Sequence, residues 1–177
     1  MNLISTPIQS PSSGKRRQMI RASVSLAVVM AFQGIPGLGV SSAFAQAMIK
    51  IGEINSYKAQ PAFLEPYKKG MELAIDEINA AGGVNGRKLQ LIIRDDNANP
   101  GDAVRAAEEL VSREQVDVLA GTFLSNIGLA VADFANQKKF FFLAGEPLTD
   151  KIVWQNGNRY TFRLRASTYM QAAMLAP

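Results

Sequence analysis

The chain has 177 residues and a formal net charge of +4 at pH 7, with no cysteine and no histidine. The missing cysteine excludes disulfides, thiolate metal sites and a lipidated N-terminal Cys, and the missing histidine excludes Ser-His-Asp and Cys-His catalysis and the usual zinc sites. An exported enzyme of this composition would depend on carboxylates, Lys, Tyr or Ser alone, so composition favours binding over catalysis.

Residues 1–45 are typical of an export signal. A basic segment precedes an apolar run over 22–32, and Ala43-Phe44-Ala45 has the A-x-A form of a cleavage site. Residues 1–45 are therefore predicted to be a signal peptide, with the mature chain beginning at Gln46. The alternative is an anchored N-terminal helix, but glycines and prolines interrupt the apolar stretch and make it a poor membrane span.

The same segment accounts for the net charge. All four of its charged residues are basic: Lys15, Arg16, Arg17 and Arg21. The remaining basic residues equal the 15 acidic ones in number, so nothing after Gln46 favours nucleic acid or an anionic membrane. Residues 15–20 also resemble a twin-arginine signal, with an ordinary general-secretion signal as the alternative. Both routes lead to the periplasm of a bacterium.

Residues 67–100 are the most informative part of the sequence. An amphipathic helix is predicted over 64–81, with an apolar face made by Tyr67, Met71, Ala74, Ile75 and Ile78. Gly82-Gly83 is expected to end this helix in a left-handed conformation, and Asn85-Gly86 to form a tight turn. A strand over 89–94 follows, and Asn99-Pro100 supplies a cap and a first-turn proline for the next helix.

The string DEINAAGGVNGRKL at 76–89, followed by Asp95-Asp96, resembles a family pattern. The pattern is D-I-N-x-x-G-G-[IV]-x-G-[RK]-x-[IL], then D-D, of the solute-binding proteins of branched-chain amino-acid type (type I periplasmic binding proteins) that serve ABC importers. The resemblance extends from Ile49 to the C-terminus. It implies an α/β fold with a doubly wound, Rossmann-like parallel sheet of order 2-1-3-4-5. It also implies binding without catalysis, cofactor or metal. An unrelated α/β domain with a good helix stop is the alternative.

Strands and helices alternate through the rest of the sequence, which indicates a parallel sheet with helices on both faces. Strands are predicted over 49–54, 89–94, 116–120, 140–143 and 159–165, and helices over 64–81, 100–114 and 126–138. The apolar run at 140–143 is typical of a central strand. In 159–165 the residues Tyr160, Phe162 and Leu164 alternate onto one side.

The implied strand order locates a binding cleft. Ligands of such sheets bind beyond the carboxyl ends of the strands where the order reverses, here between the first and third strands. The loops leaving these strands cover 55–63 and 121–126, and the loop after the fourth strand, 145–149, lies beside them.

Ser125 is predicted to cap the helix of 126–138, so that its hydroxyl and the free amides behind it, beginning with Asn126, face a ligand carboxylate. The resemblance assigns this role to a serine in this loop; a plain helix cap is the alternative. Phe63 matches an aromatic residue that in the family lies against the ligand, or is an ordinary core contact. Tyr57 is a further candidate from the same loop.

Gly145, Glu146 and Pro147 are the remaining candidates. They occupy the loop in which the family offers backbone groups and a small hydroxyl residue, but the sequence Ala-Gly-Glu-Pro-Leu-Thr departs from that pattern. Glu146 either meets a ligand ammonium or is a solvated loop acid. The departure weakens the case for a branched-chain amino acid as ligand; some relatives bind aromatic acids, amides or other small metabolites.

Two motifs have rival interpretations. Asp95-Asp96 could hold Mg²⁺ or accept a phosphoryl group, but they follow the second strand, away from the reversal, so a cap-and-turn role is preferred. The glycine-rich stretch 82–86 lacks the Lys-Ser/Thr of a phosphate loop and follows a helix, so it is interpreted as a helix stop.

The resemblance also implies a two-lobed protein. Residues 46–165 are expected to form an incomplete N-terminal lobe and residues 166–177 the truncated start of a second one, so the sequence is interpreted as a fragment. The expected function is delivery of a small solute, an amino acid or a related carboxylate or amide, to ABC-transporter permease subunits in the periplasm. A ligand-sensing receptor ectodomain and an exported enzyme of similar architecture are the alternatives.

Overall fold

The computed structural model describes residues 48–176, so the predicted signal peptide lies outside the described residues. Strands and helices alternate, as predicted. Their bounds are β1 (Ile49–Asn55), α2 (Pro61–Ala80), β2 (Leu89–Asp95), α3 (Pro100–Ser112), β3 (Val118–Gly121), α4 (Ser125–Lys138), β4 (Phe142–Ala144), the short 3-10 helix η2 (Asp150–Ile152), β5 (Thr161–Arg163) and α5 (Thr168–Leu175).

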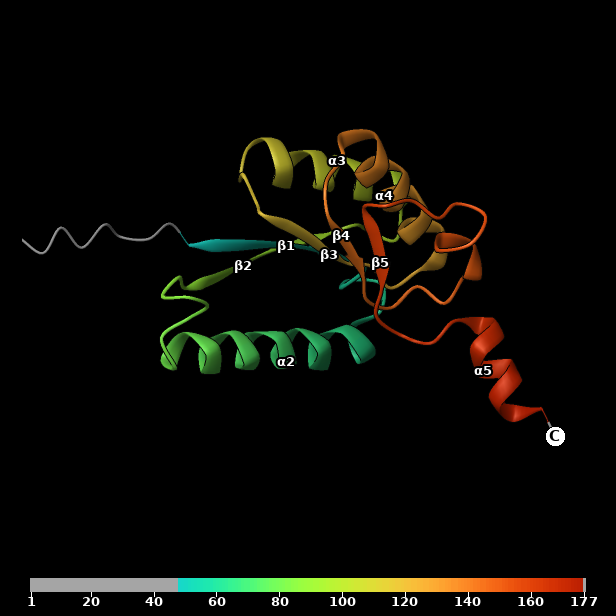
Figure 1. The fold of residues 1–177 in the computed structure, drawn as a ribbon, viewed down its shortest axis with the longest axis horizontal. Coiled ribbons are helices and arrows are strands. Elements are labelled where there is room, and N and C mark those ends of the chain that lie inside the picture. The colour runs from blue at the N-terminus through green and yellow to red at the C-terminus, as the bar shows by residue number, and fades with distance from the viewer. Residues whose placement is uncertain (1–47, 177) are drawn as a thin grey trace, which may run out of the picture. The chain divides into compact units, whose positions relative to one another are not determined.

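The five strands form one parallel sheet in the order β2-β1-β3-β4-β5, which confirms the expected order. Helix α2 lies along one face of the sheet, and α3 and α4 cover the other (Figure 1). The main core lies on the α3 and α4 side, where Ile54, Leu110, Leu119, Val131 and Phe142 are fully buried. Burial of this apolar surface is the principal stabilising contribution to such a domain.

The helix boundaries follow from local chemistry. The Asn99 side chain accepts hydrogen bonds from the amides of Gly101 at 2.8 Å and Asp102 at 3.1 Å, which caps α3 as predicted. Beyond α2, Gly82 and Gly83 have φ angles of 107° and 82°, a left-handed conformation that glycine adopts without strain. Helix α2 begins one turn before the predicted residue 64, since Pro61 is accommodated at the first helical position.

Three predicted strands, those over 116–120, 140–143 and 159–165, each begin two residues later than expected, and hydrogen bonds account for the first two shifts. The amide of Val116 donates to the carbonyl of Leu110, and the amide of Phe140 donates to the carbonyl of Ala135. These bonds tie the start of each predicted strand to the end of the preceding helix. β3 and β4 therefore start at Val118 and Phe142.

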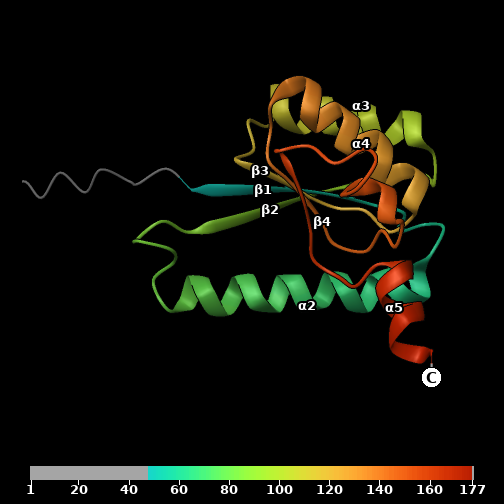
Figure 2. The ribbon, with the colours of Figure 1, turned by 45° about the vertical axis from the view of Figure 1, so that its right-hand side comes forward.

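The face of the sheet beside α2 differs from the prediction. Only Leu64 of α2 is fully buried, and Ile78 on the predicted apolar face is exposed. Phe162 on β5 and Leu164 just after it, predicted to lie on one side, are 50% and 71% exposed. Within the described residues, α2 packs against β2 at the other end of the sheet from β5, as Figure 2 shows for α2 running along β2 and β1.

Asp95 and Asp96 act as turn residues. Asp95 accepts hydrogen bonds from the backbone amides of Lys58 and Asn97, and Asp96 accepts from Ser56 Oγ at 2.7 Å and from the amide of Ala98. Across residues 48–176, no group of three or more acidic, histidine or cysteine side chains is placed to hold a metal ion. The hydrogen bonds that Asp95 and Asp96 accept from backbone amides confirm the turn role preferred from the sequence.

A buried polar cluster lies on the α2 side of β1. Because side chains alternate along a strand, Glu53 faces α2 while Ile54 enters the main core. Glu53 is fully buried, and its carboxylate accepts hydrogen bonds from Tyr57 Oη at 2.6 Å and Asn55 Nδ2 at 3.0 Å. Burial raises the pKa of Glu53 from 4.5 to about 7, and it also raises the pKa of Tyr67 in α2, which has Glu53 as a charged neighbour.

No described helix is both long enough and apolar enough to cross a membrane.

The main core generates a stability prediction. Leu110 is fully buried, whereas Leu73 on α2 is 60% exposed. Leu110→Ala is expected to lower the free energy of unfolding by about 2–5 kcal/mol, since it leaves a cavity beneath the sheet. The matched Leu73→Ala is expected to change it by about 0.5 kcal/mol or less. Urea unfolding measures both, and equal losses in the two variants would contradict the assigned core.

Glu53 generates a pH prediction. Between 4.5 and about 7 the folded protein keeps a proton on Glu53 that the unfolded chain has released, so this group's contribution to stability falls as pH rises through that window. Glu53→Gln is expected to remove this dependence, which amounts to about 3 kcal/mol.

Urea midpoints at about pH 5 and about pH 8 measure the effect. Glu72→Gln, at a side chain on α2 that is 50% exposed, is the control and is expected to leave the slope unchanged. An unaltered pH dependence in Glu53→Gln would show that the buried carboxyl does not titrate in this range.

Candidate functional site

The candidate site lies at the carboxyl ends of the strands. Since β1 pairs with both β2 and β3, the strand order reverses between β1 and β3, and the loops 56–60 and 122–124 leave the sheet at this point. The loop 145–149 follows β4, which is the next strand in the sheet. Figures 1 and 2 show the first turn of α2 and the start of α5 at this same end of the sheet.

Phe63 comes from the first part of α2 and stacks on Phe123, with ring centroids 5.8 Å apart and an interplanar angle of 25°. Phe63 is 65% exposed, so much of its ring surface is open to solvent. Phe123 lies two residues before Ser125 in the loop after β3. Phe63 and Ser125, predicted to share one cleft, therefore belong to the same edge of the sheet.

Ser125 is not the cap of α4, which corrects the prediction by one residue. Leu124 is the N-cap and provides no side-chain hydrogen bond, while Ser125 is the first helical residue and Asn126 the second. The Ser125 hydroxyl instead accepts a hydrogen bond from the amide of Thr149 at 3.2 Å. The first turn of α4 thus keeps amides that no side chain caps, beside a hydroxyl fixed by the neighbouring loop.

The loop after β4 is held in place from three sides. The amide of Gly145 donates to the carbonyl of Gly121 at 2.6 Å. Glu146 forms an ion pair with Arg165 at 2.7 Å. Pro147 is buried against α4, where a Cβ added to Gly128 would lie 2.5 Å from Pro147 Cγ. Of the predicted loop residues, Glu146 alone carries a charge, and that charge is already paired.

Tyr57 does not line an open surface. Its side chain is 8% exposed and its hydroxyl donates to Glu53, so it turns inward beneath the edge of the sheet. Burial raises its pKa, which keeps the phenol neutral. Tyr57 is therefore better placed to position the loop after β1 than to touch a ligand.

A groove of about 510 Å³ lies next to Ser125. It is lined by Ser125, Thr149, Asp150, Lys151, Trp154, Gln155, Thr168 and Tyr169. The segment entering α5 closes one side, because the amide of Thr168 donates to the carbonyl of Leu148 and the amide of Tyr169 donates to Asp150. Trp154 and Tyr169 meet edge to face, with ring centroids 5.5 Å apart.

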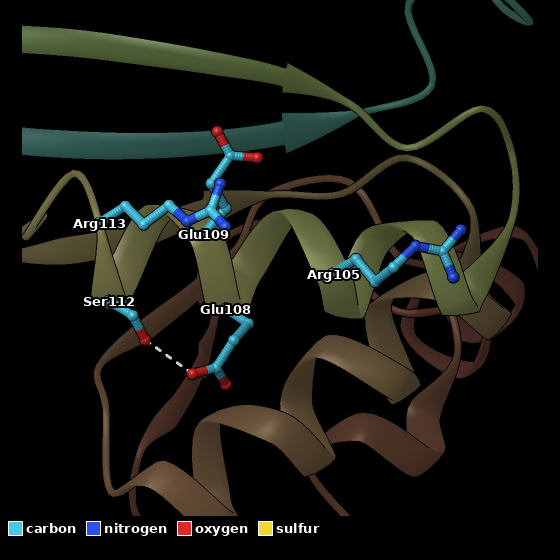
Figure 3. Close-up of a pocket in the computed structure, with 5 residues that line it drawn as sticks. All are labelled: Arg105, Glu108, Glu109, Ser112 and Arg113. Atoms are coloured by element: carbon cyan, nitrogen blue, oxygen red, sulfur yellow. Dashed lines mark hydrogen bonds between the residues drawn. The ribbon is translucent and has the colours of Figure 1, made fainter.

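A second hollow, of about 250 Å³, is formed by α3 alone (Figure 3). Its lining residues are Arg105, Glu108, Glu109, Ser112 and Arg113. Glu108 pairs with Lys138 and accepts from Ser112, and Glu109 pairs with Arg94. Because these carboxylates already have partners and the hollow is built from one helix, it is a poorer candidate than the strand-end loops.

Two features of the strand-end region were not predicted from the sequence. Phe123 was missed, although a large aromatic residue in a three-residue loop between a buried strand and a helix is a usable signal. The hydroxyl of Thr122 is buried with no hydrogen-bond partner within the described residues and lies beside the first turn of α4. Nothing in the sequence distinguishes Thr122 from an ordinary loop threonine.

Curated proteins with similar sequences are named as binding proteins. The "Amino acid binding protein" of Pseudomonas aeruginosa is 37% identical over 100 residues, which cover 53% of this chain and 27% of the relative. The "Leu/Ile/Val-binding protein homolog 2" of Brucella abortus is 29% identical over 117 residues, covering 64% and 31% respectively. The chain therefore spans about a third of the length of these relatives.

Solved structures show the same fold at similar coverage. The substrate-binding protein LivJ of Streptococcus pneumoniae, in complex with isoleucine, has a TM-score of 0.62 and 26% identity, over 68% of this chain and 34% of LivJ. A solute-binding protein from Rhodopseudomonas palustris, in complex with 3,4-dihydroxybenzoic acid, has a TM-score of 0.60 and 26% identity, over 68% and 32%.

A family model described as periplasmic binding protein matches residues 48–177, which is well over half of the chain. The relatives and solved structures named above are binding proteins, and LivJ is the substrate-binding protein of an amino-acid transporter. Fold, strand order and sequence similarity agree. The chain belongs to the periplasmic binding protein family, and proteins of the branched-chain amino-acid type are among its relatives.

Proposed function

We propose that the chain is the solute-binding component of an ABC importer and holds a small organic carboxylate at the carboxyl ends of its strands. The observation that carries this proposal is the first turn of α4. The N-cap residue Leu124 makes no side-chain hydrogen bond to the amides of this turn. The turn follows Phe123, which stacks on Phe63, and lies where the strand order reverses. Uncapped helical amides attract an anion, and stacked rings attract an apolar body.

The named relatives support a small acid as ligand. LivJ of Streptococcus pneumoniae was solved with isoleucine, and the Rhodopseudomonas palustris protein with 3,4-dihydroxybenzoic acid. Both molecules carry one carboxylate next to an apolar body. The proposed ligand contacts in this chain are Phe63, Ser125, Asn126 and the backbone of residues 145–147, with Tyr57 as support from below.

The proposed setting is the periplasm. Family members are periplasmic, and residues 1–45 have the form of a cleavable signal of either the general-secretion or the twin-arginine type. The proposed partners are the permease subunits of the importer, with no nucleic acid and no stable membrane anchor once the signal is removed.

We also propose that residues 46–165 supply one wall of the cleft and that residues 166–177 begin the opposite lobe. None of the residues of α5 is buried, which supports this boundary, while the amides of Thr168 and Tyr169 donate to the carbonyl of Leu148 and to the Asp150 carboxylate. Closure of two lobes buries a solute from both sides and gives higher affinity for the closed state.

Ser125 provides the first test. Ser125→Ala is expected to weaken carboxylate binding about 10-fold, since a hydrogen bond to a charged group is lost. Amide chemical shifts of the uniformly labelled chain, titrated with sodium benzoate and L-leucine, measure the effect. Ser112→Ala, at an exposed serine of α3 that donates to Glu108, is the matched control and should bind as the unmodified chain does.

Because Ser125 also accepts a hydrogen bond from Thr149, the urea midpoint of each variant reports any loss of fold. Ser125→Thr keeps the hydroxyl and is expected to restore binding. Equal affinity in Ser125→Ala and the unmodified chain, with both folded, would exclude Ser125 from the site. At the level of transport, loss of the gene is expected to reduce uptake of the bound solute by the source bacterium.

The two-lobe proposal predicts weak binding by this chain alone. One lobe leaves the ligand half solvated, and a loss of about three decades of affinity, from micromolar to millimolar, corresponds to about 4 kcal/mol. Calorimetric titration of the 177-residue chain with the solute that its full-length homologue binds measures this. Micromolar affinity in the chain alone would contradict the need for an opposite lobe.

A further inference from the structure

We propose that the buried carboxyl of Glu53 is a proton switch beneath the strand-end cleft, and that an anionic solute binds more tightly while this carboxyl is protonated. The proposal rests on the proposed function, because it describes the regulation of that same site. Three features carry it: the acid has no basic partner, it is bonded to the loop after β1, and a tyrosine of α2 neighbours both the acid and the loop after β4.

The lack of a basic partner is the first feature. Glu53 is fully buried, and none of the ion pairs formed among residues 48–176 includes it. The titratable side chains that face it come from the loop after β1, from α2 and from the end of β2. They are Tyr57, Tyr67 and Asp96, and none of them is basic. An ionised Glu53 therefore has neither water nor a cation to stabilise its charge.

This environment places the titration of Glu53 near neutral pH. Burial raises the pKa of Glu53 to about 7, against the hydrogen bonds from Tyr57 and Asn55, which lower it. An exposed glutamate is fully ionised at this pH. A change of pH around neutrality thus alters a charge inside the fold while the surface carboxylates keep theirs.

The bonds to the loop after β1 are the second feature. Glu53 accepts hydrogen bonds from Tyr57 Oη at 2.6 Å and from Asn55 Nδ2 at 3.0 Å. Asn55 Oδ1 in turn accepts the amide of Ser56 at 3.2 Å. Because a phenol both donates and accepts, Tyr57 can bond to either form of the carboxyl. Loss of the proton therefore adds a charge beneath the loop without breaking its attachment.

Tyr67 provides the third feature. A Cβ added to Gly145 would lie 3.4 Å from Tyr67 Oη, so this hydroxyl lies against the loop after β4. Burial raises the pKa of Tyr67, and the charges of Glu53 and Glu146 raise it further. The side chain is thus an electrostatic neighbour of the buried acid and also contacts a loop whose backbone is proposed to hold the solute.

The register of the sheet brings the acid close to the anion position as well. Glu53 is paired with Ala120 of β3, one residue before Gly121, where β3 ends. The loop 122–124 and the uncapped first turn of α4 follow directly. A carboxylate bound at this turn and an ionised Glu53 would therefore lie at the same edge of the sheet, and two negative charges across a poorly polarisable interior repel each other.

The direction of the effect follows from this repulsion. Glu53 is neutral below its pKa of about 7 and negative above it, so the affinity for an anion is expected to fall as pH rises through that value. The expected loss is about 3- to 10-fold. Binding free energies are reciprocal, so a bound anion must raise the proton affinity of Glu53 by the same factor.

Sodium benzoate is the probe, because its carboxylate stays ionised between about pH 5.5 and about pH 8.5. Amide chemical shifts of Ser125, Asn126 and Gly145 in the labelled 177-residue chain measure its dissociation constant at both pH values. We expect the constant to be about 3- to 10-fold larger at the higher pH. The carboxyl carbon shift of Glu53, followed against pH, is expected to show a higher midpoint with benzoate than without it.

Glu53→Gln tests the residue. It keeps an oxygen acceptor in the same place and removes the charge, so it is expected to bind benzoate at the higher pH as tightly as the unmodified chain does at the lower pH. Loss of fold cannot produce such a gain. Glu72→Gln is the matched control, because it removes the same charge from a side chain that is 50% exposed. It should keep the pH dependence of the unmodified chain.

Tyr57→Phe tests the origin of the midpoint. The hydrogen bond from Tyr57 lowers the pKa of Glu53, so its removal is expected to shift the affinity profile to higher pH. A purely structural role of Tyr57 would change the affinity at all pH values and leave the midpoint in place. An unchanged or lowered midpoint would show that another group controls the profile.

The outcomes separate the proposal from the function on which it rests. Equal benzoate affinity at the two pH values in the unmodified chain would overturn the proton switch and leave solute binding standing. A pH dependence that persists in Glu53→Gln would overturn it too. No response of the cleft amides to benzoate or to L-leucine at either pH would instead contradict the proposed function itself.

Discussion

The close approach of β1 and β3 at Gly121 is the constraint on which the cleft depends. Gly121 has a φ of +117°, and a Cβ at this position would collide with the carbonyl oxygen of Ile54 on β1. The carbonyl of Gly121 also accepts the amide of Gly145, which anchors the loop after β4. One residue without a side chain thus brings together the ends of three strands, and the loops that leave them converge because their starting points do.

The polar groups at this edge are largely satisfied by one another. Glu53 accepts hydrogen bonds from Tyr57 and Asn55. Asp96 accepts a hydrogen bond from Ser56, and Glu146 forms an ion pair with Arg165. Since a buried or half-buried charge with a partner is costly to separate, these pairs resist recruitment by a ligand. Several groups stay open: the exposed ring of Phe63, the uncapped start of α4, and, within the described residues, the buried Thr122 hydroxyl and Asp150 Oδ1, which have no hydrogen-bond partner. The chemistry of the edge is therefore defined as much by internal pairing as by the residue types present.

Local signals in the sequence predicted most of the fold. Gly82-Gly83, Asn85-Gly86 and Asn99-Pro100 act through their own backbone preferences, so their turns and caps were predicted at the right residues. Side-chain direction at the site was not predictable in this way. Tyr57 turns inward because its hydroxyl donates to the buried Glu53. Phe123 stacks on Phe63, which lies about sixty residues earlier in the sequence. Such pairings depend on tertiary packing, and no local pattern encodes them.

The loop after β4 links the cleft to α5. Glu146, Leu148 and Asp150 each contact a residue of the segment that enters α5, through one ion pair and backbone hydrogen bonds. Ser125 joins the same loop from α4 through the amide of Thr149. The loop is therefore bonded to both α4 and the segment entering α5. Those bonds join neighbouring positions of the loop and η2 to the start of α5.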